Sequence, residues 1–382
     1  MDFSWTADQL AFRKSVLEFG QNELDTTSPD ARGFSRELWL KCARFGIQGL
    51  TVPDEYGGSA ADVLTTMLAM EALGYACRDN GLLFSLHAHM WAVVAPILKF
   101  GTPEQKKRWL PPLCDGTLVG AHGMTEPDSG SDAFHLKTTA ERKGDRYVLN
   151  GTKTFVTNAP VADLFVIFAT VNRARGMWGI TGFVIPKDTP GLSVSRPIRK
   201  LGLKTSPMGE VVLDGCEVGA DCVIGREGQG AAIFNHSMAW ERSCILASAV
   251  GGMERQLDTC VQYAKERKQF GKPIGTFQLV ATKIVDLKVR LDTARLLLYR
   301  SAWSHAQGTN TALESAVAKL YISECAVASA LDAVQLHGGW GYTEEFGVER
   351  DLRDSIAGRL YSGTSEIQRL IIARGLGLPT ES

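Results

Sequence analysis

A stretch with strand-like patterning separates two helical regions, and this arrangement constrains the fold most. Between about residues 119 and 224, short apolar or alternating runs are divided by Gly, Pro and Asp, as in strands joined by tight turns. These runs are residues 164–171, 180–185, 192–195 and 210–213. We therefore expect a separate middle domain, a small β-barrel or sandwich, between two helical domains.

Helical patterns lie on both sides of this stretch. Thr6 with Gln9 and Thr102 with Gln105 have capping-box spacing, in which two side chains satisfy the first turn of a helix. Further helices are expected at residues 62–73 and 81–100, and later at residues 231–268, 278–307, 311–337 and 365–376. The predicted fold is α+β, with an N-terminal all-α domain (1–118), a middle β domain (119–225) and a C-terminal four-helix bundle (226–382).

Charge, apolar runs and cysteines argue against several classes of function. The 382 residues carry a formal net charge of −1, so no whole-protein field attracts nucleic acid or an anionic membrane. No secretory signal is visible at the start, and the apolar run at residues 164–171 is too short to span a bilayer. The eight cysteines contain no Cys-x-x-Cys pair. This pattern indicates reduced thiols in a cytoplasmic protein, without a metal site.

Residues 121–158 combine a turn-rich loop with a strand pattern. The loop contains Pro-Asp-Ser-Gly-Ser at residues 127–131, which permits tight bends and supplies many hydrogen bonds. Asn150-Gly151 is predicted to turn a hairpin, as is Asp214-Gly215 further on. Small residues and hydroxyls beside Phe155 could hold a planar, hydrogen-bonding ring system. A surface turn next to an ordinary hairpin explains the same pattern.

Glu241 has the most unusual position among the ionisable residues. On the helix expected from residue 231, it shares a face with Phe234, Met238, Ile245 and Ser248. A lone carboxylate in an apolar stripe is costly unless it is protonated, paired or functional. Desolvation would raise its pKa and make it a better base near neutral pH. A partly exposed glutamate that pairs with a helix neighbour is the alternative.

Two stretches resemble the signatures of one flavoprotein family. Met-Thr-Glu-Pro-Asp-Ser-Gly-Ser-Asp (124–132) is similar to the first signature of the acyl-CoA dehydrogenases, and residues 335–342 with 359–369 are similar to the second. The resemblance runs from about residue 5 to residue 377. It implies two helical domains flanking a β domain, with FAD between the β domain and the C-terminal bundle. The chain has no G-x-G-x-x-G or P-loop motif, so a Rossmann-type site is not expected.

The resemblance also implies a catalytic base. Most members carry a glutamate in a Tyr-Glu-Gly-Thr turn, but this chain has Tyr361-Ser362-Gly363-Thr364. A smaller subgroup, like the isovaleryl- and long-chain acyl-CoA dehydrogenases, has its base in a Glu-Arg pair that Glu241-Arg242 matches. Glu241 is thus expected to take the α-proton of a thioester while the β-hydrogen leaves as hydride to flavin N5. The expected substrate-binding residues are Ser362 through its backbone N–H, Arg242, Ser131 and Gly363.

The implied FAD contacts fall into several groups. The resemblance assigns Met124, Thr125, Gly130, Ser131, Phe155 and Thr157 to the isoalloxazine and ribityl groups, and Gln335, Gly338 and Gly339 to the pyrophosphate and adenine. Thr364 and Glu366 form the C-terminal edge. Arg267, Gln269, Phe270 and Gln278 match positions that reach the FAD of a neighbouring subunit, which implies a homotetramer or a homodimer. Where the family commonly has Trp, position 155 has Phe.

Within the family, residues 237–242 together with Tyr-Ser-Gly-Thr are most similar to dehydrogenases of natural-product (antibiotic) biosynthesis. Those enzymes oxidise an aminoacyl group, notably prolyl, on a peptidyl carrier protein. A short- or branched-chain acyl-CoA dehydrogenase is the runner-up. A flavin monooxygenase or a nitroalkane oxidase on the same fold is a third reading, which would make Glu241 structural. The flavin could be reoxidised by an electron-transfer flavoprotein or by oxygen.

Overall fold

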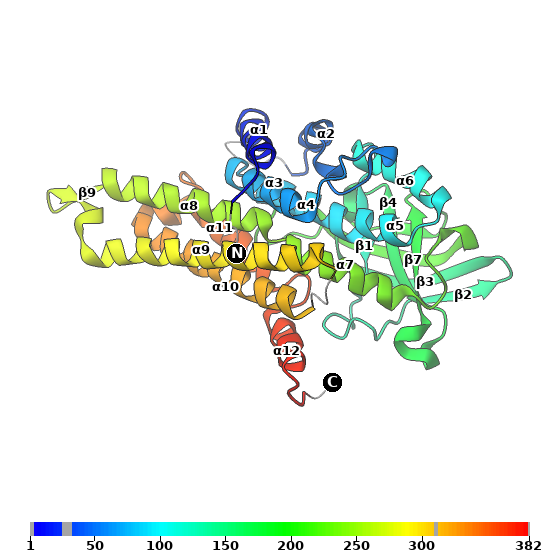
Figure 1. The fold of residues 1–382 in the computed structure, drawn as a ribbon. Coiled ribbons are helices and arrows are strands. Elements are labelled where there is room, and N and C mark those ends of the chain that lie inside the picture. The colour runs from blue at the N-terminus through cyan, green and yellow to red at the C-terminus, as the bar shows by residue number, and fades with distance from the viewer. Residues whose placement is uncertain (1–3, 25–32, 309–311, 381–382) are drawn as a thin grey trace.

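The computed structural model describes residues 4–24, 33–308 and 312–380, and confirms the α–β–α order of the chain (Figure 1). The helices before the sheet are α1 (Ala7–Glu23), α2 (Arg36–Phe45), α3 (Val63–Ala76), α4 (Asn80–His89), a π-helical turn (Met90–Val94), α5 (Ala95–Phe100) and α6 (Pro103–Cys114). Both predicted capping boxes, at Thr6 and at Thr102, are present. Helix α2 was not predicted, although Ser35 caps it and Gly46 ends it in a left-handed conformation.

Helices α4 and α5 form one continuous helical stretch, Asn80–Phe100, through the π-helical turn. This stretch is long and apolar enough to cross a bilayer, and the run at residues 164–171 was therefore the wrong one to test. Most of the stretch is buried inside the protein, as expected of a core helix.

The middle of the chain forms one mixed sheet. Its strands are β1 (Gly120–Gly123), β2 (Thr139–Lys143), β3 (Arg146–Thr157), β4 (Leu164–Thr170), β5 (Ile180–Pro186), β6 (Leu192–Val194), β7 (Met208–Gly219) and β8 (Val223–Ile224). The order is β6-β7-β3-β2-β4-β5-β8, with β1 parallel to β4. Strands β2 and β4 are joined by the single pair Thr139 and Thr170. The two halves of the sheet share one apolar core, which includes Tyr147, Phe165, Phe183 and Val211.

Neither predicted hairpin turn exists. Asn150-Gly151 lies inside β3 and Asp214-Gly215 inside β7, and the two dipeptides face each other where the β3–β7 register shifts. Gly215 has a left-handed φ of 58°, and its N–H donates to Asn150 Oδ1 at 2.8 Å. Glycines that suit a turn also suit a β-bulge. The real hairpin joins β2 to β3 through Gly144 and Asp145.

The C-terminal region is helical. It contains α7 (Gly230–Cys244), α8 (Ala247–Glu266), the small strands β9 (Lys268–Gln269) and β10 (Lys272–Pro273), α9 (Gln278–Ala306), α10 (Ala312–His337), α11 (Val348–Ile356) and α12 (Ser365–Gly375). Helices α8, α9 and α10 pack lengthwise, and β9 lies at their end remote from the sheet (Figure 1). The predicted start of α10 at residue 311 lies outside the described residues, and α11 was not predicted. The domain boundaries at 118/119 and 225/226 stay a prediction.

The helix expected at residues 231–268 is in fact two helices. Helix α7 ends at Cys244 and α8 begins at Ala247. Ser248 therefore lies on a different helix from Glu241, and the predicted apolar face was wrong in its last member. The break places the C-terminal end of α7 and the first turn of α8 against the same buried space, which Ile245 and Ser248 both line.

Candidate functional site

Glu241 lies in the last turn of α7 with its side chain turned inward. Its exposed fraction is 8%. The hydroxyl of Ser362 donates to Glu241 Oε2. Burial raises the pKa of Glu241 to about 7, against the opposing effects of this hydrogen bond, Arg242 and Lys319. The carboxyl therefore changes charge near neutral pH, in the range where it can accept a proton.

The turn that contains Ser362 is clamped from several sides. Ser362 has a left-handed φ of 54°, and its carbonyl oxygen accepts from Arg242 Nε at 3.2 Å. Lys319 on α10 donates to the Gly363 carbonyl at 2.7 Å, as does Gln368 at 2.8 Å. The side chains of Glu241 and Arg242 thus meet the same turn, although neighbours on a helix point in different directions. Strain held by so many contacts is common at functional sites.

Lys319 was not predicted from the sequence, although the reasoning that identified Glu241 applies to it. It is a lone cation in an apolar stretch of α10 and is fully buried. Burial, followed by the charge of Arg242, lowers its pKa to about 8. Lys319 and Arg242 thus both lie close enough to Glu241 to favour its ionised form.

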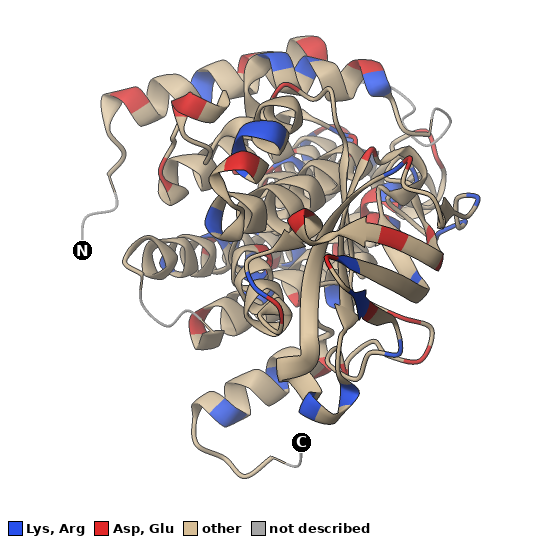
Figure 2. Cartoon of the chain, turned by 90° about the vertical axis from the view of Figure 1, so that its right-hand side faces the viewer, with Lys and Arg blue, Asp and Glu red and all other residues tan. Residues whose placement is uncertain are grey.

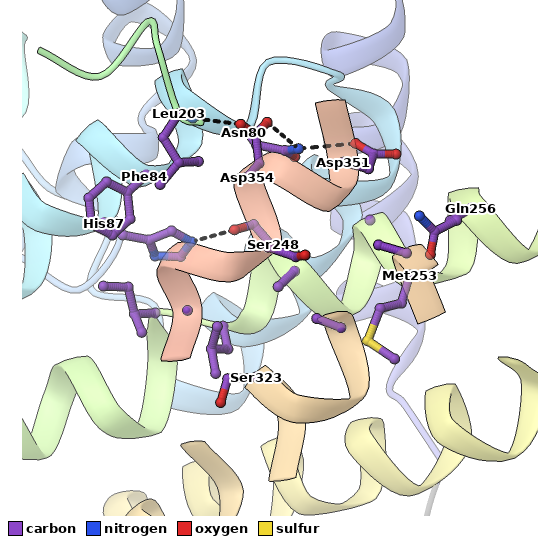
Figure 3. A pocket seen from close by; sticks show the side chains of 18 of the residues that line it. Asn80, Phe84, His87, Leu203, Ser248, Met253, Gln256, Ser323, Asp351 and Asp354 are labelled. Atoms are coloured by element: carbon purple, nitrogen blue, oxygen red, sulfur yellow. Dashed lines mark hydrogen bonds between the residues drawn. The ribbon is translucent and has the colours of Figure 1, made fainter. Parts of the chain in front are cut away.

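A cavity lies next to this turn. It is lined near the turn by Phe84, Ile245 and Tyr361. The rings of Phe84 and Tyr361 pack with centroids 4.7 Å apart. Figure 3 shows that His87, one turn after Phe84 on α4, meets Ser248, and that Asn80 donates to Asp351 and Asp354. The cavity lining therefore combines apolar side chains with hydrogen-bonded polar ones.

The predicted loop and strand β3 are held together by a buried lysine. Lys153 on β3 donates to the Met124 carbonyl at 3.1 Å and forms an ion pair with Glu126 at 2.7 Å. The N–H of Thr154 donates to the Thr125 carbonyl at 2.9 Å. Met124, Thr125, Phe155 and Thr157 are thereby brought to one region, as predicted. Gly130 and Ser131 lie on the exposed part of the same loop.

Phe155 has the properties of a platform for a flat ligand. Its exposed fraction is 61%, and its φ is 54° near the end of strand β3. An exposed aromatic ring on strained backbone is costly unless something covers it. Three residues later, Asn158 donates to the Ser85 carbonyl on α4 at 3.1 Å. Because the adjacent Phe84 packs on Tyr361, helix α4 links the Phe155 region to the Glu241 region.

Another group of predicted residues lies far from this region. Arg267, Gln269 and Phe270 follow α8, and Gln278 begins α9, at the end marked by β9 in Figure 1. Gln335, Gly338 and Gly339 are at that end too, because Tyr263 donates to the His337 carbonyl at 3.3 Å. The 20 residues of α8 span about 30 Å between this end and the break beside Glu241. Thr364 and Glu366, by contrast, directly follow the Ser362 turn, where Thr364 caps α12.

Comparison with known proteins shows the family. The description "Acyl-CoA dehydrogenase, N-terminal domain" matches residues 6–117, the middle-domain description matches residues 121–216, and the C-terminal-domain description matches residues 228–377. The L-prolyl-[peptidyl-carrier protein] dehydrogenase of Serratia sp. (strain ATCC 39006) is 44% identical over 381 residues, which cover 99% of each chain. The chain belongs to the acyl-CoA dehydrogenase family.

Two solved structures are closely similar to this member of the family. The prolyl acyl carrier protein oxidase AnaB has 50% sequence identity and a TM-score of 0.97, covering 98% of this chain and 100% of its own. The structure described as PigA with FAD and proline has 44% identity and a TM-score of 0.96, covering 99% and 100%. The predicted family and fold class are thus confirmed.

Proposed function

We propose that this protein is an FAD-dependent dehydrogenase of an aminoacyl thioester, with a prolyl group on a carrier protein as its substrate. The observation that supports this most is the buried carboxyl of Glu241, whose pKa is raised to about 7, in a family whose similar members are named for prolyl carrier proteins. We place the enzyme in the cytoplasm, because the thiols of all eight cysteines are free.

The residues around Phe155 fit a flavin. The exposed ring offers a stacking surface, Met124 supplies an apolar neighbour, and Thr125 and Thr157 supply hydroxyls. A Cβ at Gly130, Gly338 or Gly339 would meet nothing within 4 Å, so space for a ligand is open at each. FAD, when bound, would accept a hydride from the β-carbon of the substrate. These residues bind and orient that group.

The protein's own chemistry is the movement of one proton. Glu241 takes the proton from the substrate's α-carbon, which a thioester acidifies. The backbone N–H of Ser362 donates to the thioester carbonyl. Gly363, Arg242 and Ser131 also bind the substrate. As Glu241 becomes neutral, Arg242 and Lys319 remain charged beside the growing enolate and stabilise it electrostatically. The product is an α,β-unsaturated thioester.

The separation of the two groups of FAD residues supports an oligomer. Phe270 is 92% exposed with a φ of 51°, and it lies about 30 Å along α8 from the Glu241 region. A second copy that brings its β9 end to the first copy's β domain would complete the cofactor site. We propose a homo-oligomer, a tetramer or a dimer, on this basis. The mass of the FAD-loaded protein by light scattering tests it, since a monomer that retains FAD contradicts it.

A short- or branched-chain acyl-CoA dehydrogenase is the second candidate. The apolar side chains of Phe84 and Tyr361 that line the cavity favour it, because they suit a hydrocarbon chain. For both candidate functions, an electron-transfer flavoprotein or oxygen would reoxidise the flavin.

Anaerobic mixing of the yellow enzyme with thioesters tests the proposed function. Prolyl-loaded carrier protein should bleach the flavin absorbance within seconds, and butyryl-CoA and isovaleryl-CoA should do so far more slowly. Faster bleaching by an acyl-CoA would favour the second candidate. No bleaching by any thioester would favour an oxygenase or oxidase of the same fold.

Removal of the Ser362 hydroxyl should change the pH dependence of catalysis. Its hydrogen bond favours the ionised form of Glu241 and so lowers the pKa of that carboxyl. In Ser362→Ala the pKa rises above its value of about 7, and the rate of flavin reduction begins to increase only at higher pH. A hydrogen bond to a charged group is worth about 1.5–3 kcal/mol. We therefore expect a loss of about tenfold at pH 6 and little loss at pH 9.

Stopped-flow measurement of kcat/KM from pH 5 to 9 follows this effect, since the pH dependence of that ratio reports the pKa of the base in the free enzyme. Ser15→Ala is a matched control, because the Ser15 hydroxyl donates to the Ala11 carbonyl within α1 and not to Glu241. An equal loss at every pH in Ser362→Ala would show that the hydroxyl acts on the substrate instead.

A further inference from the structure

An exposed segment of the β domain combines aromatic, thioether and guanidinium side chains. Residues 172–178 are all exposed, and they include Met177, with an exposed fraction of 37%, and Trp178, with 66%. Arg173 and Arg175 come from the same turn. Within the part of the chain that the structure describes, neither arginine forms an ion pair with a carboxylate. Trp, Met and Arg are the residue types that are enriched at protein–protein interfaces.

This arginine–tryptophan segment (residues 172–178) is fixed in place. The Arg173 guanidinium donates to the carbonyl of Lys137 at 2.7 Å, which follows the loop at residues 124–132. At the other end, the Trp178 carbonyl lies 2.6 Å from where a Cβ of Gly228 would be, and Ile180 lies 2.8 Å from that of Gly230. Only glycine fits so closely. The segment is therefore seated against the residues that begin α7, so its exposed side chains keep a defined position.

The start of α7 lies at a fixed distance from Glu241. Eleven residues separate Gly230 from Glu241 on this helix, which corresponds to about 17 Å of helix rise. A phosphopantetheine arm has about as many bonds as four to five extended residues, and it spans roughly 15 Å. An arm attached to a protein at the arginine–tryptophan segment would thus bring its thioester to Glu241.

We propose that the arginine–tryptophan segment is the docking surface for the carrier protein, and that it binds an acidic face of that partner around its phosphopantetheine serine. This inference rests on the proposed function and extends it to the partner. Trp178 and Met177 supply the apolar anchor, and Arg173 and Arg175 pair with carboxylates. Charge complementarity of this kind raises the rate of association more than the final affinity. Exposed ion pairs also weaken with salt, so binding of the carrier should weaken as the ionic strength rises.

The charge pattern elsewhere agrees with a local site. Figure 2 shows basic and acidic residues interspersed over the helices and the strands, with neither sign covering the face in view. Nearby, Lys137 already pairs with Asp128 at 2.7 Å, and Arg142 lies 3.6 Å from Glu227. The two arginines of the segment are thus available to a partner.

The test compares a substrate with the carrier and one without it. The holoenzyme and its Arg175→Glu/Trp178→Ala variant are mixed anaerobically with prolyl-loaded carrier protein and with prolyl-pantetheine, which has the arm alone. In the variant, kcat/KM for the carrier should fall by about tenfold or more, and kcat/KM for prolyl-pantetheine should change less than about twofold. Arg44→Glu, an exposed charge reversal on α2, is the control and should leave both substrates unchanged.

Several outcomes would overturn the docking surface. An unchanged rate with the carrier, or equal losses with both substrates, would mean that the segment does not bind the carrier. A changed oligomeric mass in the variant would assign the segment to a contact between copies of this chain. If the unmodified enzyme oxidises neither substrate, the proposed function itself fails, and the docking surface fails with it.

Discussion

Glu241→Gln should bind FAD as before but should lose about 10³- to 10⁴-fold in the rate at which substrate bleaches the flavin. The amide has nearly the same shape and can still accept a hydrogen bond from Ser362, so the turn at residues 361–364 is expected to stay in place. It cannot accept the α-proton. Because no other carboxylate contacts the Ser362 side chain among the described residues, no neighbour can replace this base. Stopped-flow absorbance with prolyl-loaded carrier measures the loss.

Two observations control this result. The visible spectrum and the FAD content of Glu241→Gln should match those of the parent enzyme, which separates lost chemistry from lost cofactor. Glu324→Gln is a matched control, since Glu324 accepts from Arg359 and Ser365 and does not contact Glu241. Rapid bleaching by Glu241→Gln would mean that the base is elsewhere and that Glu241 is structural.

Lys153→Met should destabilise the protein by about 3–5 kcal/mol. Lys153 and Glu126 are both buried, with side-chain exposures of 0% and 3%. Burial lowers the pKa of Lys153 to about 8. Burial alone would raise the pKa of Glu126, but the ammonium of Lys153 outweighs it and lowers that pKa. Removing the cation therefore leaves a buried carboxylate without a counter-ion, held only by the N–H groups of Lys137 and Thr138. The loss is a large part of the stability of an ordinary domain, and urea unfolding of the apoprotein measures it.

The double variant Glu126→Gln/Lys153→Met separates charge from packing. It removes the unpaired charge, so part of the lost free energy of unfolding should return. FAD should bind more weakly in Lys153→Met, because the Met124 carbonyl loses its partner and the loop is held to β3 by fewer hydrogen bonds. A loss of less than about 1 kcal/mol, typical of an exposed ion pair, would show that water reaches the pair and compensates it.

Local chemistry in the sequence predicted the helices better than the turns. Thr6 and Thr102 cap their helices as expected, because a capping box involves only four consecutive residues. Asn150-Gly151 and Asp214-Gly215 were wrong as hairpin turns. A dipeptide that permits left-handed backbone suits a turn and a bulge alike, and only the pairing of β3 with β7 distinguishes the two. The break between α7 and α8 lacks a Gly or Pro signal and was missed for that reason.

The candidate site could be predicted in part. Glu241 was identifiable because a lone carboxylate in an apolar pattern is costly. A buried carboxylate needs a hydrogen-bond donor, and the hydroxyl of Ser362 supplies it. Lys319 and the Lys153–Glu126 pair come from elements far apart in the sequence, so their partners could not be read from spacing. Phe270 lies about 30 Å along helix α8 from Glu241 in the same chain. Its proposed contact with FAD therefore depends on a second copy of the chain, which the sequence alone does not place.

Exchange of the substrate's α-hydrogen with solvent tests the central claim most directly. The enzyme, with its flavin chemically reduced beforehand so that no hydride can leave, is incubated in D2O with prolyl-loaded carrier, and the recovered prolyl group is weighed by mass spectrometry. We predict that the parent enzyme incorporates one deuterium at the α-carbon and that Glu241→Gln incorporates none above the background without enzyme. Equal incorporation by both proteins would contradict the assignment of Glu241 as the group that takes the proton.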